Sequence, residues 1–277
     1  MHGRRHTAAR TTGLIAGMIV AAVAWVLPIR AADEVFDRTV PLRSGGSFAL
    51  QNVNGSVTII GWDRDAVEVR AVKSSPGTSA ELAVSDLARV QVGIDAKADR
   101  VVVTTTYPKD EHLDVSVTYN VLVPRDVWLQ EVATVNGAVY VRGVQGDGQL
   151  RSQLRSVNGD VEVSDSGGPF SVRTTNGNIH MAVARLTAPA ALPRSSGVTP
   201  VRVETVNGSI VLAVPAATSA SLDVRCLSGD FYSDLPAFTL AGYTPRAFQA
   251  TLGSGGAPVR LSTVNGAIRI ASLPQGI

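Results

Sequence analysis

The sequence contains few of the residues that usually carry chemistry in proteins. It has one cysteine and four histidines among 277 residues, and aromatic residues make up only 5%. Cys226 therefore has no partner for an intramolecular disulfide. Only His112 and His180 lie beyond the N-terminal segment, which excludes a histidine-rich metal site. The sequence also lacks a nucleophile elbow, a phosphate-binding loop and a dinucleotide fingerprint, so it predicts no catalytic motif and no cofactor.

Residues 1–31 have the pattern of an export signal. Three arginines begin the segment, an apolar run follows over residues 13–27, and a cleavage site is expected before Ala32. The run is shorter than the roughly 20 residues of a membrane-spanning helix. We therefore expect a cleaved signal, no stable membrane insertion afterwards, and a protein in the periplasm or at the cell surface. Retention of the segment as an anchor is the alternative.

The charge balance changes when this signal is removed. The whole chain has 25 basic and 23 acidic residues, and residues 1–31 contain four of the arginines and no acidic residue. The remaining chain has 21 basic against 23 acidic residues. Because it has no excess of positive charge, nucleic acid is not an expected partner.

Beyond residue 31 the dominant pattern is alternation of apolar and polar residues. The segments 66–72, 89–94 and 113–121 alternate in this way, which predicts strands with one buried face. A short helix over residues 79–87 is the exception.

We divide the chain after the signal into an N-terminal β region, residues 32–125, and a repeat array, residues 126–277. The β region is expected to be continuous with the array. Two stretches rich in proline, alanine, serine or glycine, near 188–200 and 234–257, predict insertion loops that protrude from the array.

The tripeptide Val-Asn-Gly recurs along the chain, and its flanking residues recur with it. A small hydroxyl residue precedes it, and one small or polar residue and then an alternating apolar pair follow it. Two variants, at 175–177 and 227–229, complete the series. The predicted turn positions are Asn54, Gly55, Asn136, Gly137, Asn158, Gly159, Asn176, Gly177, Asn207, Gly208, Gly229, Asn265 and Gly266. Cys226 occupies the hydroxyl position of its repeat, which predicts a small buried side chain rather than a reactive thiol.

Recurrence of this kind predicts one structural unit stacked on copies of itself. Stacking explains why the residues around the turn also recur, because identical side chains align from one unit to the next. Asn can then hydrogen-bond to its neighbours, and Gly accepts a left-handed corner. We predict an all-β chain with a β-solenoid-like repeat array preceded by the β region. Asn-Gly is also a favoured hairpin turn, so a β-sandwich or meander of Asn-Gly hairpins is the alternative.

The same features resemble a known family. The N-terminal β region, the segment Tyr119-Asn120-Val121-Leu122-Val123-Pro124 and repeats such as Arg155-Ser156-Val157-Asn158-Gly159-Asp160-Val161 are similar to the bacterial putative-adhesin β-strand-repeat family, a domain family of unknown function. The resemblance covers roughly residues 45–272. It implies a right-handed β-solenoid-like fold in an envelope protein, and it brings no catalytic residues.

Two outward columns supply the candidate ligand strip. Tyr140, Glu162 and His180 each lie three residues after a turn glycine, so stacking would place them on successive rungs about 4.8 Å apart. Arg155 and Arg173 each lie three residues before a turn Asn. These adjacent arginines should repel each other unless Glu162 or a ligand anion lies beside them, which suggests docking of an anionic envelope polymer. Ordinary exposed residues joined by ion pairs are the simpler interpretation.

The sequence thus favours an exported, non-enzymatic β-repeat protein that acts as an adhesin-like or structural envelope module. Its partner would be an envelope polysaccharide or another envelope protein, and self-association is compatible with the open ends of a solenoid. A carbohydrate-active β-helix enzyme is one alternative, although such enzymes use paired carboxylates and the strip contains a single one. A self-assembling envelope scaffold is the other.

Overall fold

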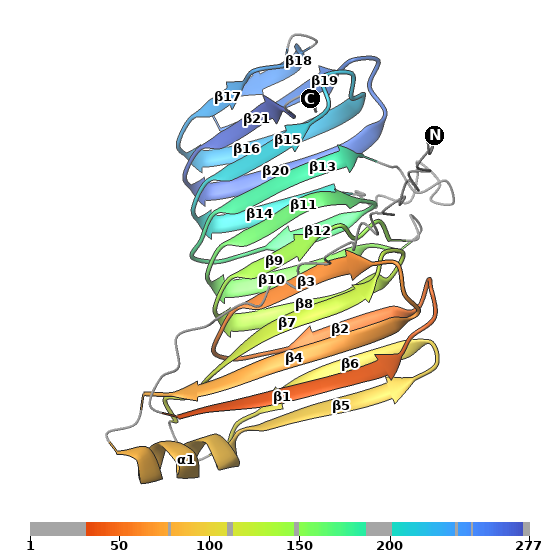
Figure 1. Cartoon of the computed structure of the whole chain (residues 1–277). Coiled ribbons are helices and arrows are strands. Elements are labelled where there is room, and N and C mark those ends of the chain that lie inside the picture. The colour runs from red at the N-terminus through yellow and green to blue at the C-terminus, as the bar shows by residue number, and fades with distance from the viewer. Residues whose placement is uncertain are drawn as a thin grey trace, which may run out of the picture.

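The computed structural model describes residues 32–76, 79–109, 113–146, 150–186, 201–235, 238–244 and 246–273. These residues form two large β-sheets and a short helix (Figure 1). Sheet A contains, in spatial order, β1 (Ala32–Pro41), β4 (Ala66–Ser75), β7 (Ser116–Pro124), β3 (Val57–Trp62), β9 (Val139–Arg142), β11 (Val161–Gly167), β13 (Ile179–Arg185), β15 (Ile210–Val214), β21 (Ile268–Ser272) and β17 (Phe231–Ser233). Sheet B contains β18 (Phe238–Thr244), β19 (Ala247–Leu252), β16 (Ala220–Ser228), β20 (Ala257–Asn265), β14 (Val201–Asn207), β12 (Phe170–Arg173), β10 (Ser152–Asn158), β8 (Trp128–Asn136), β2 (Ser47–Gln51), β6 (Arg100–Thr106) and β5 (Gln91–Lys97).

Each Asn-Gly turn joins a strand of sheet B to a strand of sheet A, and we call this unit a rung. Neighbouring rungs pair in parallel and in register: Asn158 lies opposite Asn136 in sheet B, and Val161 lies opposite Val139 in sheet A. Hairpins would instead pair the two strands of one turn with each other in antiparallel fashion. The β-solenoid prediction is therefore confirmed, and the hairpin meander is wrong.

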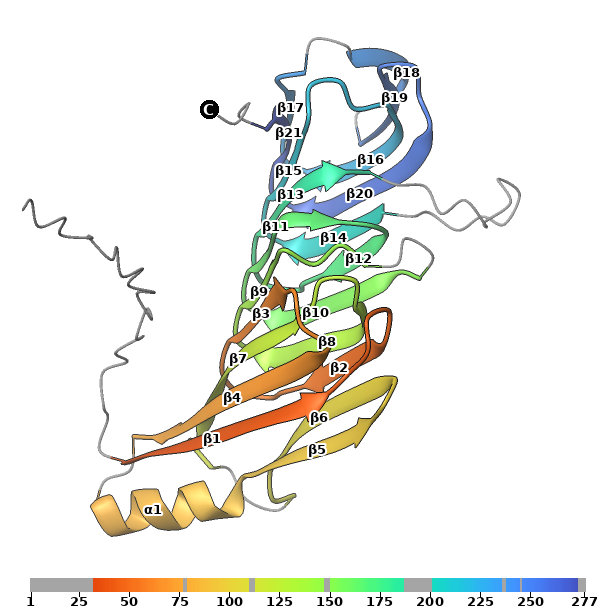
Figure 2. The same cartoon turned by 45° about the vertical axis from the view of Figure 1, so that its right-hand side comes forward.

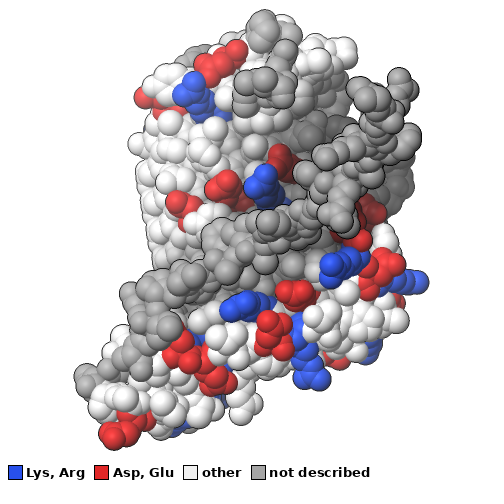
Figure 3. All heavy atoms as spheres, in the orientation of Figure 1, with Lys and Arg blue, Asp and Glu red and all other residues white. Residues whose placement is uncertain are grey.

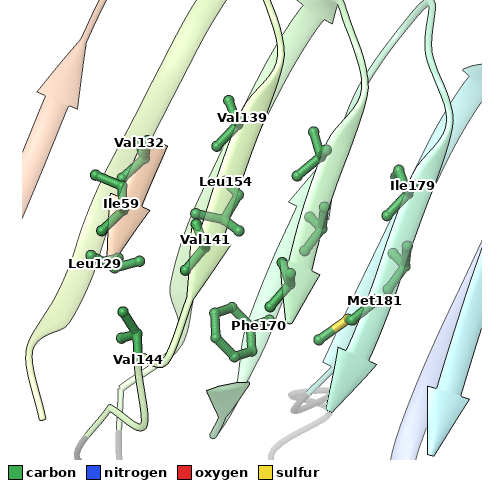
Figure 4. Close-up of a cluster of buried hydrophobic side chains, with 14 of the residues drawn as sticks. Ile59, Leu129, Val132, Val139, Val141, Val144, Leu154, Phe170, Ile179 and Met181 are labelled. Atoms are coloured by element: carbon green, nitrogen blue, oxygen red, sulfur yellow. The ribbon is translucent and has the colours of Figure 1, made fainter. Parts of the chain in front are cut away.

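The core lies between the two sheets, which face each other (Figure 2). Because side chains of a strand alternate between its two faces, every second residue of a rung points inward. In the central rungs most of these inward residues are aliphatic, with one phenylalanine and one methionine, and they contact one another from both sheets (Figure 4). Buried serines and threonines occupy the remaining inward positions. Leu154, Val161, Ile179 and Ile210 are each 0% exposed. Burial of this continuous apolar column stabilises the stack.

The turn asparagines form a continuous amide ladder along one edge of the solenoid. Each Asn after Asn54 donates from Nδ2 to the Oδ1 of the preceding Asn at 2.8 Å. The ladder runs through Asn54, Asn136, Asn158, Asn176, Asn207 and Asn265. Beneath it, a buried Ser or Thr hydroxyl two residues before each turn Asn except Asn54 donates to the glycine carbonyl of the adjacent rung, as Ser156 does to Gly137 at 2.8 Å. Cys226 occupies this position at the end of the stack, with Sγ 3.2 Å from the carbonyl oxygen of Gly266.

The turn glycines are required by close stacking more than by a left-handed backbone. A Cβ on Gly177 would lie 2.2 Å from the carbonyl oxygen of Gly159, and a Cβ on Gly208 would lie 1.9 Å from that of Gly177. Neither glycine has a left-handed φ, although Gly55 does, at 116°. The expectation that glycine serves a left-handed corner is thus wrong for these central turns, because adjacent backbones approach too closely for any side chain.

The spatial order of the rungs departs from the sequence order at both ends. The last rung along the chain, β20–β21, lies between β14–β15 and β16–β17, so that Asn265 pairs with both Asn207 and Ser228. At the other end, β2–β3 lies between β6–β7 and β8–β9. Among the described strands, those of the four rungs from β8–β9 to β14–β15 stack on one another in the order of the sequence.

The stretch 234–257 is not the protruding loop that its composition suggested. It contains β18 and β19, which form an antiparallel hairpin and extend sheet B beyond β16. Gly242 lies within β18, and the other glycines mark the turn after β19, where Gly253 and Gly255 have φ of 54° and 77°. The other expected insertion, 188–200, lies outside the described residues, as does the expected signal, 1–31.

The N-terminal part adds antiparallel strands and the helix α1 (Ala80–Arg89) to the stack. Ser79 caps the start of the helix, which confirms the short helix expected over 79–87. At the other end of α1, the nearly buried Lys73 donates from Nζ to the carbonyl oxygens of Leu87 and Val90, at 3.1 and 3.0 Å. Among the described residues, no helix is long and apolar enough to span a membrane.

Candidate functional site

Tyr140, Glu162 and His180 lie side by side on the outer face of sheet A. Strands β9, β11 and β13 carry them at paired positions, with Glu162 opposite both Tyr140 and His180. The alternation of β11 turns Val161 and Val163 into the core and leaves Glu162 exposed between them. The predicted adjacency of these three residues on successive rungs is therefore confirmed.

The three side chains border an open depression of about 400 Å³ in the middle of this face. The depression is lined by Tyr140, Asp160, Val161, Glu162, Asn178, His180, Ser209 and Val211. All of these residues belong to four neighbouring rungs whose inner residues are fully packed. The site is thus shallow, and its walls belong to a rigid scaffold.

A second row of polar residues supports the depression. In two of its rungs, the residue that follows the turn glycine accepts a hydrogen bond from the backbone of the next rung: Asp160 Oδ1 from Asn178 N–H at 2.7 Å, and Asn178 Oδ1 from Ser209 N–H at 2.9 Å. Sequence reasoning recorded this position only as small or polar and did not place it in the site. Its spacing of four residues from the hydroxyl column was the available signal.

The carboxylate of Glu162, unlike that of Asp160, does not help to hold the rungs together. Among the residues that the structure describes, it makes no ion pair and no side-chain hydrogen bond. By contrast, the sheet A arginines Arg142 and Arg269 pair with Asp165 and Asp234, at 3.0 and 2.6 Å. An exposed carboxylate, a phenol and an imidazole in one row can all hydrogen-bond to hydroxyl groups, and the Tyr140 ring offers an apolar face.

Arg155 and Arg173 do not belong to this strip. They project from β10 and β12 on the outer face of sheet B, because the strands before and after a turn lie in opposite sheets. The expectation that Glu162 might neutralise them is therefore wrong. Arg155 lies 3.9 Å from Glu131 instead, and Arg173 donates from both Nε and Nη2 to one carboxylate oxygen, Oε2, of Glu204.

The arginines of sheet B are held by protein carboxylates. Glu204 also binds Arg202, and Asp223 binds Arg260 at 2.9 Å. Burial raises the pKa of Glu204, but the hydrogen bonds and charges of Arg202 and Arg173 outweigh this effect and lower its pKa overall. This face fits the simpler interpretation of cross-strand ion pairs, and it does not need a ligand anion to hold its arginines together.

On the side of sheet A, the surface over the N-terminal strands and the surface of the upper rungs differ in charge. Charged side chains gather over β1 and β4, whereas most of the visible surface of the upper rungs is uncharged (Figure 3). Within the described residues, no group of three or more His, Cys, Asp or Glu side chains is arranged to hold a metal ion. The depression itself combines two carboxylates, Asp160 and Glu162, with polar and aromatic side chains.

Comparisons with known proteins identify relatives of this architecture. The model of the Toastrack DUF4097 family matches residues 48–271. A putative cell adhesion protein from Clostridium sporogenes ATCC 15579 has a similar structure, with a TM-score of 0.43 and 9% sequence identity over 87% of this chain and 100% of the other. A putative adhesin from Bacteroides fragilis NCTC 9343 gives 0.41 and 11% over 87% and 99%. No curated protein matches the chain.

Proposed function

The chain is a member of the Toastrack DUF4097 family, and from that premise we propose that it is an exported, non-enzymatic interaction module that binds an envelope polysaccharide on the outer face of sheet A. The row of Tyr140, Glu162 and His180 in its depression carries this proposal. Export rests on the signal-like composition of residues 1–31. The periplasm and the cell surface are both compatible with it.

A polysaccharide suits this row for two reasons. Sugar hydroxyl groups hydrogen-bond to carboxylate, imidazole and amide groups, and the apolar face of a sugar ring packs against an aromatic ring such as that of Tyr140. The row also follows the axis of the stack, where rungs repeat about every 4.8 Å. An extended polymer laid along this axis would contact several rungs at once.

Binding without cleavage follows from the carboxylates. Glycoside hydrolysis generally uses two carboxyl groups, one of them as a proton donor. The depression contains Asp160 and Glu162, but Asp160 already accepts the backbone N–H of Asn178 at 2.7 Å. Asp160 is thus committed to the stack, and Glu162 remains without a catalytic partner. The proximity of these two residues is the one observation that favours a carbohydrate-active enzyme instead.

The test is binding of residues 32–277 to a panel of envelope polysaccharides, with analysis of products for every ligand that binds. Tyr140→Ala and Glu162→Gln should each weaken binding at least about tenfold, as expected for the loss of about 1.4 kcal/mol. The double variant Arg155→Glu/Arg173→Glu is the matched control on sheet B and should bind normally.

Each other outcome contradicts a defined part of the proposal. Loss of binding in the arginine variant alone would show that the ligand binds to sheet B and is anionic. Shortened products would show an enzyme. Absence of binding to every polysaccharide would leave an envelope protein as the partner.

A further inference from the structure

The two rungs β14–β15 and β16–β17 do not touch each other, because the chain leaves a gap one rung wide between them. The segment 257–272 fills this gap: β20 pairs with β14 and β16, and β21 pairs with β15 and β17. Along the sequence, β16–β17 and the hairpin β18–β19 both precede the segment that fills the gap. The gap is thus a binding site for a strand–turn–strand segment that comes last in the sequence.

The neighbouring rungs bind this segment through the same residues that recur in the repeat. Asn265 donates to Asn207 at 2.8 Å, and Thr263 Oγ1 donates to the carbonyl oxygen of Gly208 at 2.9 Å. A Cβ on Gly266 would lie 2.1 Å from that same carbonyl oxygen, so a residue with a side chain cannot take its place. Inward, Ile268 and Ile270 are 0% exposed. A hydroxyl residue, Val, Asn and Gly in this order, followed by alternating isoleucines, therefore defines the ligand.

The connection that delivers the segment is a short turn rich in glycine, and in the monomer hydrogen bonds to Ser219 and Ser221 hold its conformation. Gly253, Gly255 and Gly256 separate β19 from β20, and their φ values are 54°, 77° and 142°. Glycine adopts such conformations, and others, without the strain of a Cβ. The hinge 253–256 can therefore direct the segment into the gap of its own chain or into that of another.

We propose that the gap is a strand-acceptor site, and that its second partner is the segment 257–272 of another copy of this chain. Reciprocal exchange closes a twofold dimer that keeps the contacts of β20 and β21 with their neighbouring rungs, while the turn 253–256 changes its conformation, as in domain swapping. This proposal goes beyond polysaccharide binding, because sheet A outside these rungs plays no part in it.

The single cysteine provides the test. Cys226 and Thr263 are paired positions on the adjacent parallel strands β16 and β20, and both are buried. A neighbouring-strand separation of about 4.8 Å lies within the range that a disulfide bridges. In the full chain carrying Thr263→Cys, refolding under reduction and then oxidation should give a disulfide within one chain in the monomer and between two chains in the exchanged dimer.

The expected result is a covalent dimer on a non-reducing gel. Below saturation, the ratio of dimer to monomer should rise about tenfold for each tenfold rise in the refolding concentration, by mass action. The control Cys226→Ser/Thr263→Cys should give no specific dimer. A disulfide confined to single chains at every concentration would overturn the exchange, and absence of any disulfide would overturn the pairing itself.

A second measurement does not depend on refolding of the whole chain. A protease site placed in 253–256 allows cleavage of the folded protein, after which a fluorescent peptide of residues 257–273 is added in mild denaturant. The peptide should be taken up with a stoichiometry of one, and the same peptide carrying Ile268→Asp should not be taken up. Failure of the unaltered peptide to replace the released segment would overturn the acceptor site.

Discussion

The central rungs and the C-terminal rungs are built from the same repeat but are assembled by different rules. From β8–β9 to β14–β15, each rung stacks on the one that precedes it in the sequence, whereas β20–β21 enters between two earlier rungs. The local contacts are nevertheless the same, since Thr205 bonds to Gly177 and Thr263 bonds to Gly208, both at 2.9 Å. The repeat therefore fixes where each residue lies within a rung, and it does not fix which rung becomes its neighbour.

The end of the amide ladder explains the altered order. The variant turn Leu227-Ser228-Gly229 has no amide side chain. If β16–β17 followed β14–β15 directly, Ser228 would separate Asn207 from Asn265 and interrupt the ladder. Insertion of β20–β21 keeps all six asparagines contiguous and moves Ser228 to the end, where it pairs with Asn265.

The largest expected effect is at β15, the boundary between the two parts. Ile210→Asp places an unpaired charge at a position that is 0% exposed, which should cost about 4–5 kcal/mol or more and unfold the array. The control is Val211→Asp on the same strand, which points to the outer face and should change the free energy of unfolding by less than about 1 kcal/mol. Thermal unfolding followed by circular dichroism compares them. A folded Ile210→Asp protein would contradict the assignment of inner and outer faces.

A smaller loss of stability is expected when a glycine of a central turn is replaced, and almost none when a glycine of the terminal hairpin is replaced. Gly177→Ala forces a Cβ to within 2.2 Å of the Gly159 carbonyl oxygen, so the rungs must move apart, at a cost of about 1–3 kcal/mol. A Cβ on Gly242 in β18 meets no atom within 4 Å, and Gly242→Ala should change stability by less than about 0.5 kcal/mol. Chemical denaturation of both variants measures the difference. Equal effects would show that close stacking is not what selects glycine in the central turns.

The sequence predicted the columns well because they arise within a rung. Alternation gave the inner residues, recurrence gave the amide ladder, and the position of Cys226 gave its place among the buried hydroxyls. It also placed Tyr140, Glu162 and His180 side by side. These features depend only on the period of a strand and on the parallel stacking of like on like.

What the sequence did not predict depends on relations between rungs. Arg155 and Glu162 both point outward, but the turn between them places them on opposite faces, so they cannot share a ligand strip. The composition of 234–257 suggested a loop, but Gly242 is part of strand β18 and the other glycines lie in the turn after β19. The spatial order of the last two rungs depends on the hairpin that separates them in the sequence. The one feature of the sequence that indicated this order was the missing side-chain amide at Ser228.

Breaking the ladder should distinguish its middle from its end. Asn158→Ser removes two amide hydrogen bonds, to Asn136 and from Asn176, and should cost about 1–2 kcal/mol. Asn265→Ser removes only the bond to Asn207, so about half that cost is expected. Free energies of unfolding from denaturant titration provide the measurement. An equal cost at both positions would mean that the ladder does not act as a chain of pairwise bonds.

The smallest effect should be a gain. All amides of the ladder donate toward its N-terminal end, so Ser228→Asn places a new Nδ2 beside the Asn265 amide oxygen, its paired neighbour. One additional hydrogen bond at an exposed edge should stabilise the fold by about 0.5–1 kcal/mol, which raises Tm by about 1–4 °C for a chain of this size. Ser228→Asp is the matched control, because it has nearly the same shape but brings an acceptor against an acceptor. If Ser228→Asp stabilised the fold as much as Ser228→Asn, a hydrogen bond from the new side-chain amide could not be the cause. Ser228 would then mark the end of the ladder for a reason other than its missing donor.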